Sequence, residues 1–262
     1  MCYKFVVLLF SFWLFSKVGA NPLVVIAYED RPGPPHYLGE GFTPSHSPGI
    51  TPDLLNLIAL RLKYKIEYRR YPWSRCLSML GKNQVDAVFH ASFKPERLKL
   101  GVFPMKDGQP DSFKKVHRKA YVLYKLKGSD LTWDGKQFQN LDGVIGATYK
   151  YSIVDQLRTM GLVVDEAYNA EMNFRKLVGG RLVGVVDLEN IADFMLSVRS
   201  DRFSQVVKVQ PPISVKDYYI IFSHHFYQEN TQLVEKIWNE IYQTHKNGDY
   251  EKIAKRYLKN LQ

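Results

Sequence analysis

Two pairs of acidic residues have the type and spacing for acid–base chemistry. Glu29 and Asp30 follow one short apolar run, and Asp187 and Glu189 follow another. A carboxylic acid held in a cleft can protonate a leaving group, so either pair has the chemistry of a general acid. Paired acids beside loops are also common surface features, and neither pair belongs to a longer catalytic motif. The residues alone therefore favour a binding protein over an enzyme.

Arg97 is the best single candidate for binding an anion. Its guanidinium group is a planar fork that can donate two parallel hydrogen bonds to a carboxylate, and it stays charged at any pH of interest. Arg97 stands inside a mixed charge run, 94–99, that contains Lys94 and Glu96. Taken alone, an arginine in such a run is more often an exposed residue near the start of a helix.

Other motifs exclude several classes of function. The pair His224-His225 lacks HExxH or Cys/His spacing, so we expect a solvated loop and no metal. No nucleophile elbow and no phosphate-binding glycine loop is present, which predicts no cofactor. Basic stretches with interleaved aromatic residues, 64–73 and 113–127, resemble single-strand nucleic-acid surfaces only in composition, and an amphipathic strand explains them. We expect no nucleic-acid partner.

Composition and charge are those of a folded globular protein. The chain has 262 residues, of which 45% are hydrophobic and 24% are charged. The formal net charge is +10, and it becomes +8 if a segment containing Lys4 and Lys17 is removed. Of the two cysteines, Cys2 lies in the same segment and Cys76 does not. The mature chain therefore has no intrachain disulfide, and its fold depends on the hydrophobic core.

The first 20 residues have the pattern of an export signal. A basic residue, Lys4, precedes an apolar run from Phe5 to Phe15, and the small residues Val18-Gly19-Ala20 precede Asn21. The run is too short to span a bilayer of about 30 Å as a helix. We expect cleavage before Asn21, which makes the protein periplasmic if the source is a Gram-negative bacterium. An uncleaved N-terminal anchor is the alternative.

From residue 21 onward, short β-rich runs alternate with helical patterns, which is typical of α/β proteins with mainly parallel strands. Thr51 is expected to cap the first helix, with Pro52 at its first position. Changes of character occur at 105–112 and at 210–212. We expect strands over 23–27, 65–71, 85–89, 144–147, 162–164, 182–186 and 218–223, and helices over 52–62, 72–80, 152–160, 170–178, 230–245 and 249–258.

Five short segments carry a resemblance to a known family. In chain order they are GITPDLL at 49–55, GKNQVDA at 81–87, PER at 95–97, GGRL at 179–182 and GDYEKI at 248–253. Their order and spacing, together with the export signal, resemble the family 3 extracellular solute-binding proteins, the amino-acid-binding receptors of ABC transporters. The resemblance spans nearly all of the mature chain.

The resemblance implies a fold and a domain organisation. The fold is a two-lobed α/β clamshell of the periplasmic-binding-protein type II, with two hinge strands and the ligand in the cleft. In this chain, residues 21–112 and 218–262 would form lobe 1, and residues 113–217 would form lobe 2. The two changes of character fall where the chain should cross between the lobes.

The resemblance also implies site residues in lobe 1. Arg97 occupies the position whose guanidinium group binds the ligand α-carboxylate. Ala91 and Ser92 follow a buried strand, where family members offer backbone groups and a hydroxyl. Tyr28 and Trp73 stand where aromatic residues cover the ligand. Because 14% of the residues are aromatic, Trp73 fits the hydrophobic core equally well.

Lobe 2 departs from the family pattern. After the strand 144–147, the chain offers Tyr151 and Ser152, with Lys150 where glycine is common. After the strand 182–186, family members present an aspartate that binds the ligand ammonium, and an ungapped count places Leu188 there. A shift of one residue restores Asp187. Successive strand side chains point to opposite faces, so only one of the two faces the cleft, and we favour Leu188.

The implied function is the capture of a small polar solute. If Leu188 faces the cleft, we expect this solute to carry a carboxylate and no free α-amine. Asp187 facing the cleft would instead predict an amino acid. We expect a monomer whose closed form is read by an inner-membrane partner, an ABC permease or a sensor kinase. The alternatives are an exported dehydratase that uses one of the acid pairs, and a degenerate clamshell that signals without binding.

Overall fold

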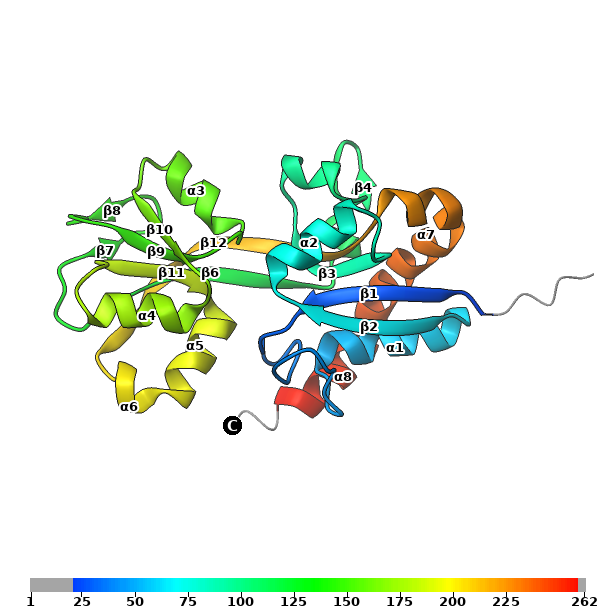
Figure 1. Cartoon of the computed structure of the whole chain (residues 1–262), viewed down its shortest axis with the longest axis horizontal. Helices are drawn as coiled ribbons and strands as arrows, with labels where there is room; N and C mark the ends of the chain where they lie inside the picture. The colour runs from blue at the N-terminus through cyan, green and yellow to red at the C-terminus, as the bar shows by residue number, and fades with distance from the viewer. Residues whose placement is uncertain (1–20, 259–262) are drawn as a thin grey trace, which may run out of the picture.

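The computed structural model describes residues 21–258, so the proposed export signal at residues 1–20 lies outside the described residues. One sheet of eight strands runs along the whole molecule in the order β10-β9-β11-β6-β12-β3-β1-β2 (Figure 1). The strands are β1 (Leu23–Glu29), β2 (Lys65–Tyr71), β3 (Ala87–Ser92), β6 (His117–Leu126), β9 (Ile145–Thr148), β10 (Val164–Ala167), β11 (Gly184–Leu188) and β12 (Val206–Phe222). Two small hairpins pair β4 (Met105–Lys106) with β5 (Gln109–Pro110) and β7 (Thr132–Trp133) with β8 (Phe138–Gln139).

The sheet has two parallel halves joined by two long antiparallel strands. β1 pairs in parallel with β2 and β3, and this half is called lobe 1. β9 pairs in parallel with β10 and β11, and this half is called lobe 2. β6 and β12 pair with each other between them, and Figure 1 shows both strands crossing from one lobe to the other. The expected two-lobed α/β clamshell is confirmed, whereas the exact lobe boundaries remain a prediction.

Helices cover both faces of the sheet in lobe 1. Alternate residues of β1 point to opposite faces. Val24, Ile26 and Tyr28 join a core with the helices α1 (Ile50–Leu62), α7 (His224–Lys246) and α8 (Asp249–Leu258). Ala27 joins the core on the other face, under α2 (Trp73–Gly81). A short helical turn, η1 (Pro95–Lys99), follows β3, and a second one, η2 (Ser112–Lys114), precedes β6.

Lobe 2 repeats this arrangement on a smaller scale. One face of its sheet is covered by α4 (Ala170–Val178), α5 (Glu189–Val198) and α6 (Ser200–Phe203), with Phe174 and Phe203 in the shared core. The other face carries α3 (Ile153–Thr159) and the β7–β8 hairpin, and its core is continuous with the α2 core of lobe 1. The two lobes therefore share a hydrophobic layer on the side where α2 and α3 lie.

Several expected elements differ from the structure. α1 begins at Ile50 with Gly49 at its N-cap, and Thr51 does not cap it, because its hydroxyl hydrogen-bonds His90 Nε2 at 2.8 Å. The strand expected at 162–164 lies at 164–167, and the helix expected at 230–245 begins at residue 224. The pair His224-His225 is therefore in the first turn of α7 and not in a loop.

One helix and the first part of one long strand are among the features that were not expected. α5 follows β11 without an intervening loop, and β12 extends upstream through residues 206–217. The prolines at 211 and 212 obscure this strand in the sequence, since proline lacks the N–H that a ladder needs. They are accommodated because the pairing of β12 with β6 is irregular between Val209 and Ser214.

Candidate ligand-binding site

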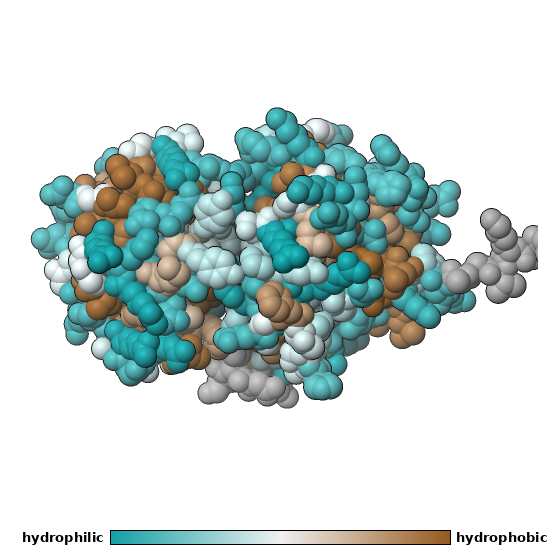
Figure 2. Space-filling view, in the orientation of Figure 1, coloured by the Kyte–Doolittle hydropathy of each residue, from teal (hydrophilic) through white to brown (hydrophobic). Residues whose placement is uncertain are grey.

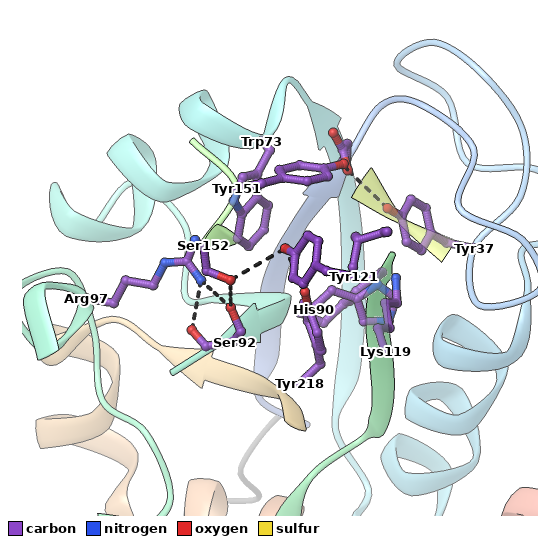
Figure 3. Close-up of a pocket in the computed structure, with 13 residues that line it drawn as sticks. Tyr37, Trp73, His90, Ser92, Arg97, Lys119, Tyr121, Tyr151, Ser152 and Tyr218 are labelled. Carbon is purple, nitrogen blue, oxygen red and sulfur yellow. Dashed lines mark hydrogen bonds between the residues drawn. The ribbon is translucent and has the colours of Figure 1, made fainter. Parts of the chain in front are cut away.

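A small pocket lies where the carboxyl ends of strands from both lobes meet the two crossing strands, the position at which open α/β sheets bind ligands. Its free volume is about 20 Å³, room for roughly one water molecule, so the lobes are closed on one another. Figure 2 shows the side chains of the two lobes meeting along the middle of the visible face. The pocket (Figure 3) is lined by Glu29, Tyr37, Trp73, Phe89, His90, Ser92, Arg97, Lys119, Tyr121, Tyr151, Ser152, Leu188 and Tyr218.

Arg97 stands at one end of the pocket and is only 5% exposed. One guanidinium nitrogen donates to the Ser92 carbonyl at 2.7 Å and to the Ser92 hydroxyl at 2.9 Å, and the other donates to the Lys150 carbonyl at 3.3 Å. The guanidinium carbon lies 5.7 Å from the centre of the Trp73 ring. Among residues 21–258, no carboxylate pairs with Arg97, so a buried positive charge is balanced only by neutral oxygens. Such a group is suited to bind an anionic ligand.

Hydroxyl groups from both lobes surround Arg97. The Ser92 hydroxyl donates to the Ser152 hydroxyl across the lobe interface at 2.9 Å. Tyr218 donates to Tyr121 at 2.9 Å, and Tyr121 lies 3.4 Å from the Ser152 hydroxyl. This chain of hydroxyls gives the pocket polar groups without formal charge, suited to hydrogen-bond a solute.

Glu29 forms a second bridge between the lobes. Its side chain, at the end of β1, accepts hydrogen bonds from Tyr37 at 3.0 Å and from Tyr151 of lobe 2 at 2.9 Å, and it pairs with Arg31 at 2.6 Å. Glu29 and Tyr151 also line a neighbouring hollow of about 360 Å³ between the lobes. Their hydrogen bond therefore separates the small pocket from a space large enough for an amino-acid-sized solute.

Lys119 and His90 line the other end of the pocket, and the rings of His36 and His117 pack beside His90. Lys119 lies on β6 and is 5% exposed, and burial lowers the pKa of its ammonium group to about 7. The rings of His36 and His117 stack with centres 3.8 Å apart, and His90 packs edge-on to His117 at 4.3 Å. Burial lowers the pKa of all three imidazoles well below the usual range, so the rings are neutral at pH 7.

An irregularity of the backbone positions His90. Its φ of 68° lies in the left-handed region, which is uncommon for a residue with a side chain. It occurs where the pairing of β12 with β3 shifts register between Tyr219 and Ile220. Bulges of this kind redirect side chains beside functional sites, and here the imidazole lines the pocket.

The structure assigns different surroundings to Asp187 and Leu188. Leu188 lines the pocket, and Asp187 does not. The Asp187 carboxylate is fully buried and accepts hydrogen bonds from the Thr148 hydroxyl at 2.6 Å and from the Leu188 amide at 2.7 Å. Burial outweighs these bonds and raises the pKa of Asp187 to about 6. No acid of β11 is therefore directed at the pocket.

The other predicted site residues divide into two groups. Five of them line one pocket, namely Ser92, Arg97, Trp73, Tyr151 and Ser152. Ala91 and Tyr28 are buried in the core without lining it, at 0% and 1% exposure. As ligand contacts, all of these residues remain predictions.

Sequence reasoning missed several lining residues. Tyr37 lies in a proline- and glycine-rich loop, and no local pattern marks its contact with Glu29. Lys119, Tyr121 and Tyr218 lie on the crossing strands, where the resemblance supplied no motif. The one available signal was the alternation of residues 117–124, which places Lys119 and Tyr121 on the same face of a strand.

Comparison with known proteins identifies the family. The chain matches the model of bacterial extracellular solute-binding proteins, family 3, over residues 25–260, and it belongs to that family. A comparison with curated protein sequences found no match. Within residues 21–258, no helix is both long and apolar enough to cross a membrane, and no cluster of three or more His, Cys, Asp or Glu residues is arranged to hold a metal ion.

Solved structures show the same fold at low sequence identity. A histidine kinase sensor domain with similarity to periplasmic binding proteins is 18% identical, with a TM-score of 0.71 over 91% of this chain and 97% of that chain. The substrate-binding protein of an amino acid ABC transporter is 16% identical, with a TM-score of 0.68 over 90% and 99%. An ancestral amino-acid-binding protein, a precursor of cyclohexadienyl dehydratase, is 15% identical, with a TM-score of 0.66 over 90% and 94%.

Proposed function

We propose that this protein captures a small carboxylate-bearing solute between its lobes and presents the closed form to a membrane partner. The observation that carries the proposal is the Arg97 guanidinium, which is buried at the lobe interface and pairs with no carboxylate in the described part of the chain. Leaving a charge buried without a counter-charge is unfavourable. A ligand carboxylate would supply that counter-charge when the lobes open and close around it.

The proposed ligand has no free α-amine. Leu188 lines the pocket, and the Asp187 carboxylate is occupied by Thr148 and by the Leu188 amide. A ligand ammonium beside Leu188 would lose its hydration at a cost of several kcal/mol without gaining an acidic partner on β11, and the carboxylate of Glu29 is already held by Tyr37, Tyr151 and Arg31. Oxo acids, hydroxy acids and simple carboxylates are therefore favoured over amino acids.

A thermal-shift screen tests this proposal. Amino acids and their deaminated analogues are added in matched pairs to the exported protein. The proposal expects stabilisation by a deaminated acid and less by the amino acid of the same skeleton. Clear stabilisation by a free amino acid, abolished in Asp187→Asn and kept in Leu188→Ala, would contradict it.

The second candidate is a sensor that closes without a solute. It is favoured by the lobe–lobe hydrogen bonds and the free volume of about 20 Å³. If no acid in the screen changes the melting temperature of the protein, the result would support this candidate.

Export to the periplasm is part of the proposal. N-terminal sequencing of exported material should give Asn21, and an intact Met1 would instead indicate an uncleaved anchor.

A further inference from the structure

Lys119 is a buried cation without an ion-pair or hydrogen-bond partner among the described residues. Its side chain lines the pocket, and within residues 21–258 its ammonium group makes no ion pair and no hydrogen bond by ordinary distance criteria. Its nearest characterised neighbours are aromatic faces, since the nitrogen lies 5.1 Å from the centre of the Tyr37 ring and 5.5 Å from that of Tyr218. Cation–π contacts stabilise an ammonium far less than water does, so the site lacks a strong acceptor for this group.

The surrounding groups supply one negative charge, that of Glu29, which attracts the Lys119 ammonium group through space without an ion pair or hydrogen bond to it among the described residues. Glu29 is the acid that lines the same pocket, but its carboxylate oxygens are taken up by Tyr37, Tyr151 and Arg31. The neighbouring histidines are neutral, and both ring nitrogens of His117 are buried without a hydrogen bond to any described residue. With Glu29 balanced by Arg31, the pocket holds two uncompensated cationic side chains, Arg97 and Lys119.

The two cations stand apart. Figure 3 shows Arg97 beside Ser92 and Ser152 at one end of the pocket and Lys119 beside Tyr37 and His90 at the other. The rings of Tyr121 and Tyr151 lie between them in this view. A single carboxylate held by Arg97 would therefore leave Lys119 uncompensated.

We infer that Lys119 is a second anion anchor, so that the ligand of this site is a small diacid with one carboxylate at Arg97 and the other at Lys119. The inference rests on the proposed function and narrows it to a ligand class. The aromatic rings of Tyr121 and Tyr151, which line the same pocket, suit an apolar spacer between the two acidic groups. Because Lys119 lies on a crossing strand and Arg97 in lobe 1, the ligand would bridge a lobe and the hinge region.

Calorimetry with matched acids tests the inference. The probes are succinate, glutarate, adipate and terephthalate, each compared with its monocarboxylate counterpart (butyrate, valerate, hexanoate and benzoate). The expected result is at least one diacid that binds about tenfold or more tightly than its counterpart. Lys119→Met, which keeps the chain length and removes the charge, should abolish that advantage, so that each diacid binds no more tightly than its monocarboxylate counterpart. Lys127→Met, at an exposed lysine just beyond β6, is the matched control. It should change neither the diacid affinity nor the monocarboxylate affinity.

A pH series on the unaltered protein avoids any question of folding. Above pH 7, Lys119 loses its proton, so diacid affinity should fall by up to about tenfold per pH unit, whereas monocarboxylate affinity at Arg97 should begin to fall only near pH 8, the pKa of the neighbouring Lys216. The groups facing Lys119 are Glu29 of β1, Tyr37 and His36 of the following loop, His90 of β3 and Tyr218 of β12. The histidines are neutral throughout this range and do not contribute.

The outcomes separate the two proposals. Equal diacid affinity in the unaltered protein and in Lys119→Met, with monocarboxylates still bound through Arg97, would overturn the second anchor and leave the proposed function intact. Failure to bind any carboxylate would overturn both.

Discussion

The Arg97 guanidinium of lobe 1 donates a hydrogen bond to the Lys150 carbonyl of lobe 2 at 3.3 Å. The same lobes are joined by the Ser92–Ser152 hydrogen bond and by the ion pair of Lys94 with Asp155. Groups expected to bind a solute therefore hold the clamshell closed, and a solute that enters must replace these contacts with its own. Closure and binding are thus coupled through the same atoms.

Removing the Tyr151 hydroxyl should favour the open form. This hydroxyl donates to Glu29 across the interface at 2.9 Å, and loss of one such bond costs about 1 kcal/mol of closure. In Tyr151→Phe, small-angle X-ray scattering should show a larger mean radius of gyration than in the parent. Tyr149→Phe, at a ring that is 46% exposed, is the control and should scatter like the parent. Identical curves for all three proteins would mean that the hydroxyl does not hold the lobes together.

The stability contribution of Asp187 should become less favourable as the pH rises through a defined window. Burial raises its pKa from 3.8 to about 6, so the folded state binds the proton more tightly than the unfolded state. The free energy of unfolding therefore falls as the pH rises from about 4 to 6, by about 3 kcal/mol for this group. Asn cannot titrate, so Asp187→Asn should gain that amount relative to the parent between pH 4 and pH 7 in urea denaturation.

A matched variant separates this effect from general acid sensitivity. Asp201 is a surface carboxylate with a side chain that is 74% exposed. The free energy of unfolding of Asp201→Asn should have the same pH dependence as that of the parent. If the free energy of unfolding of Asp187→Asn differs from that of the parent by the same amount at every pH, the pKa of Asp187 is not raised in the folded state.

Much of the fold is predictable because its strands and helices carry local patterns. β2 and α8 have the expected bounds, since alternation and helical periodicity are clear there. The extent of β12 is not predictable, because the register irregularity that accommodates Pro211 and Pro212 depends on its pairing with a distant strand, β6.

The candidate site was predictable only where a motif reached it. Arg97 and Ser92 follow recognisable segments, and they do meet in one pocket. Lys119 and Tyr37 enter the site through pairing of the crossing strand and through the path of a loop, which no local pattern specifies. Leu188 lines the pocket and Asp187 does not, and the role of either residue toward a ligand stays a prediction.

The histidine cluster should make the protein sensitive to acid. Burial lowers the pKa values of His36, His90 and His117. Below about pH 6.5, these imidazoles therefore become protonated in the unfolded state while they stay neutral in the folded state. Each histidine then reduces the free energy of unfolding by up to about 1.4 kcal/mol per pH unit as the pH falls. His117→Phe keeps a ring in the stack, and it should flatten the loss of stability between pH 6.5 and pH 5.

The control for this cluster is an exposed imidazole. His225 pairs with Glu229 at the surface, and its side chain is 61% exposed. His225→Phe should leave the pH dependence of unfolding unchanged. Equal slopes for His117→Phe and the parent would show that the buried rings do not limit stability in acid.

The central claim is that Arg97 anchors a ligand carboxylate, and calorimetry on Arg97→Ala with the best acid from the screen tests it most directly. Removing a charged anchor from a desolvated cleft should weaken binding by about 2 to 5 kcal/mol. Arg256→Ala, at a surface arginine paired with Asp53 and 62% exposed, should cost less than about 1 kcal/mol. The account predicts a loss of affinity of at least about thirtyfold in Arg97→Ala and almost none in Arg256→Ala. An affinity in Arg97→Ala within a few-fold of the parent would contradict it.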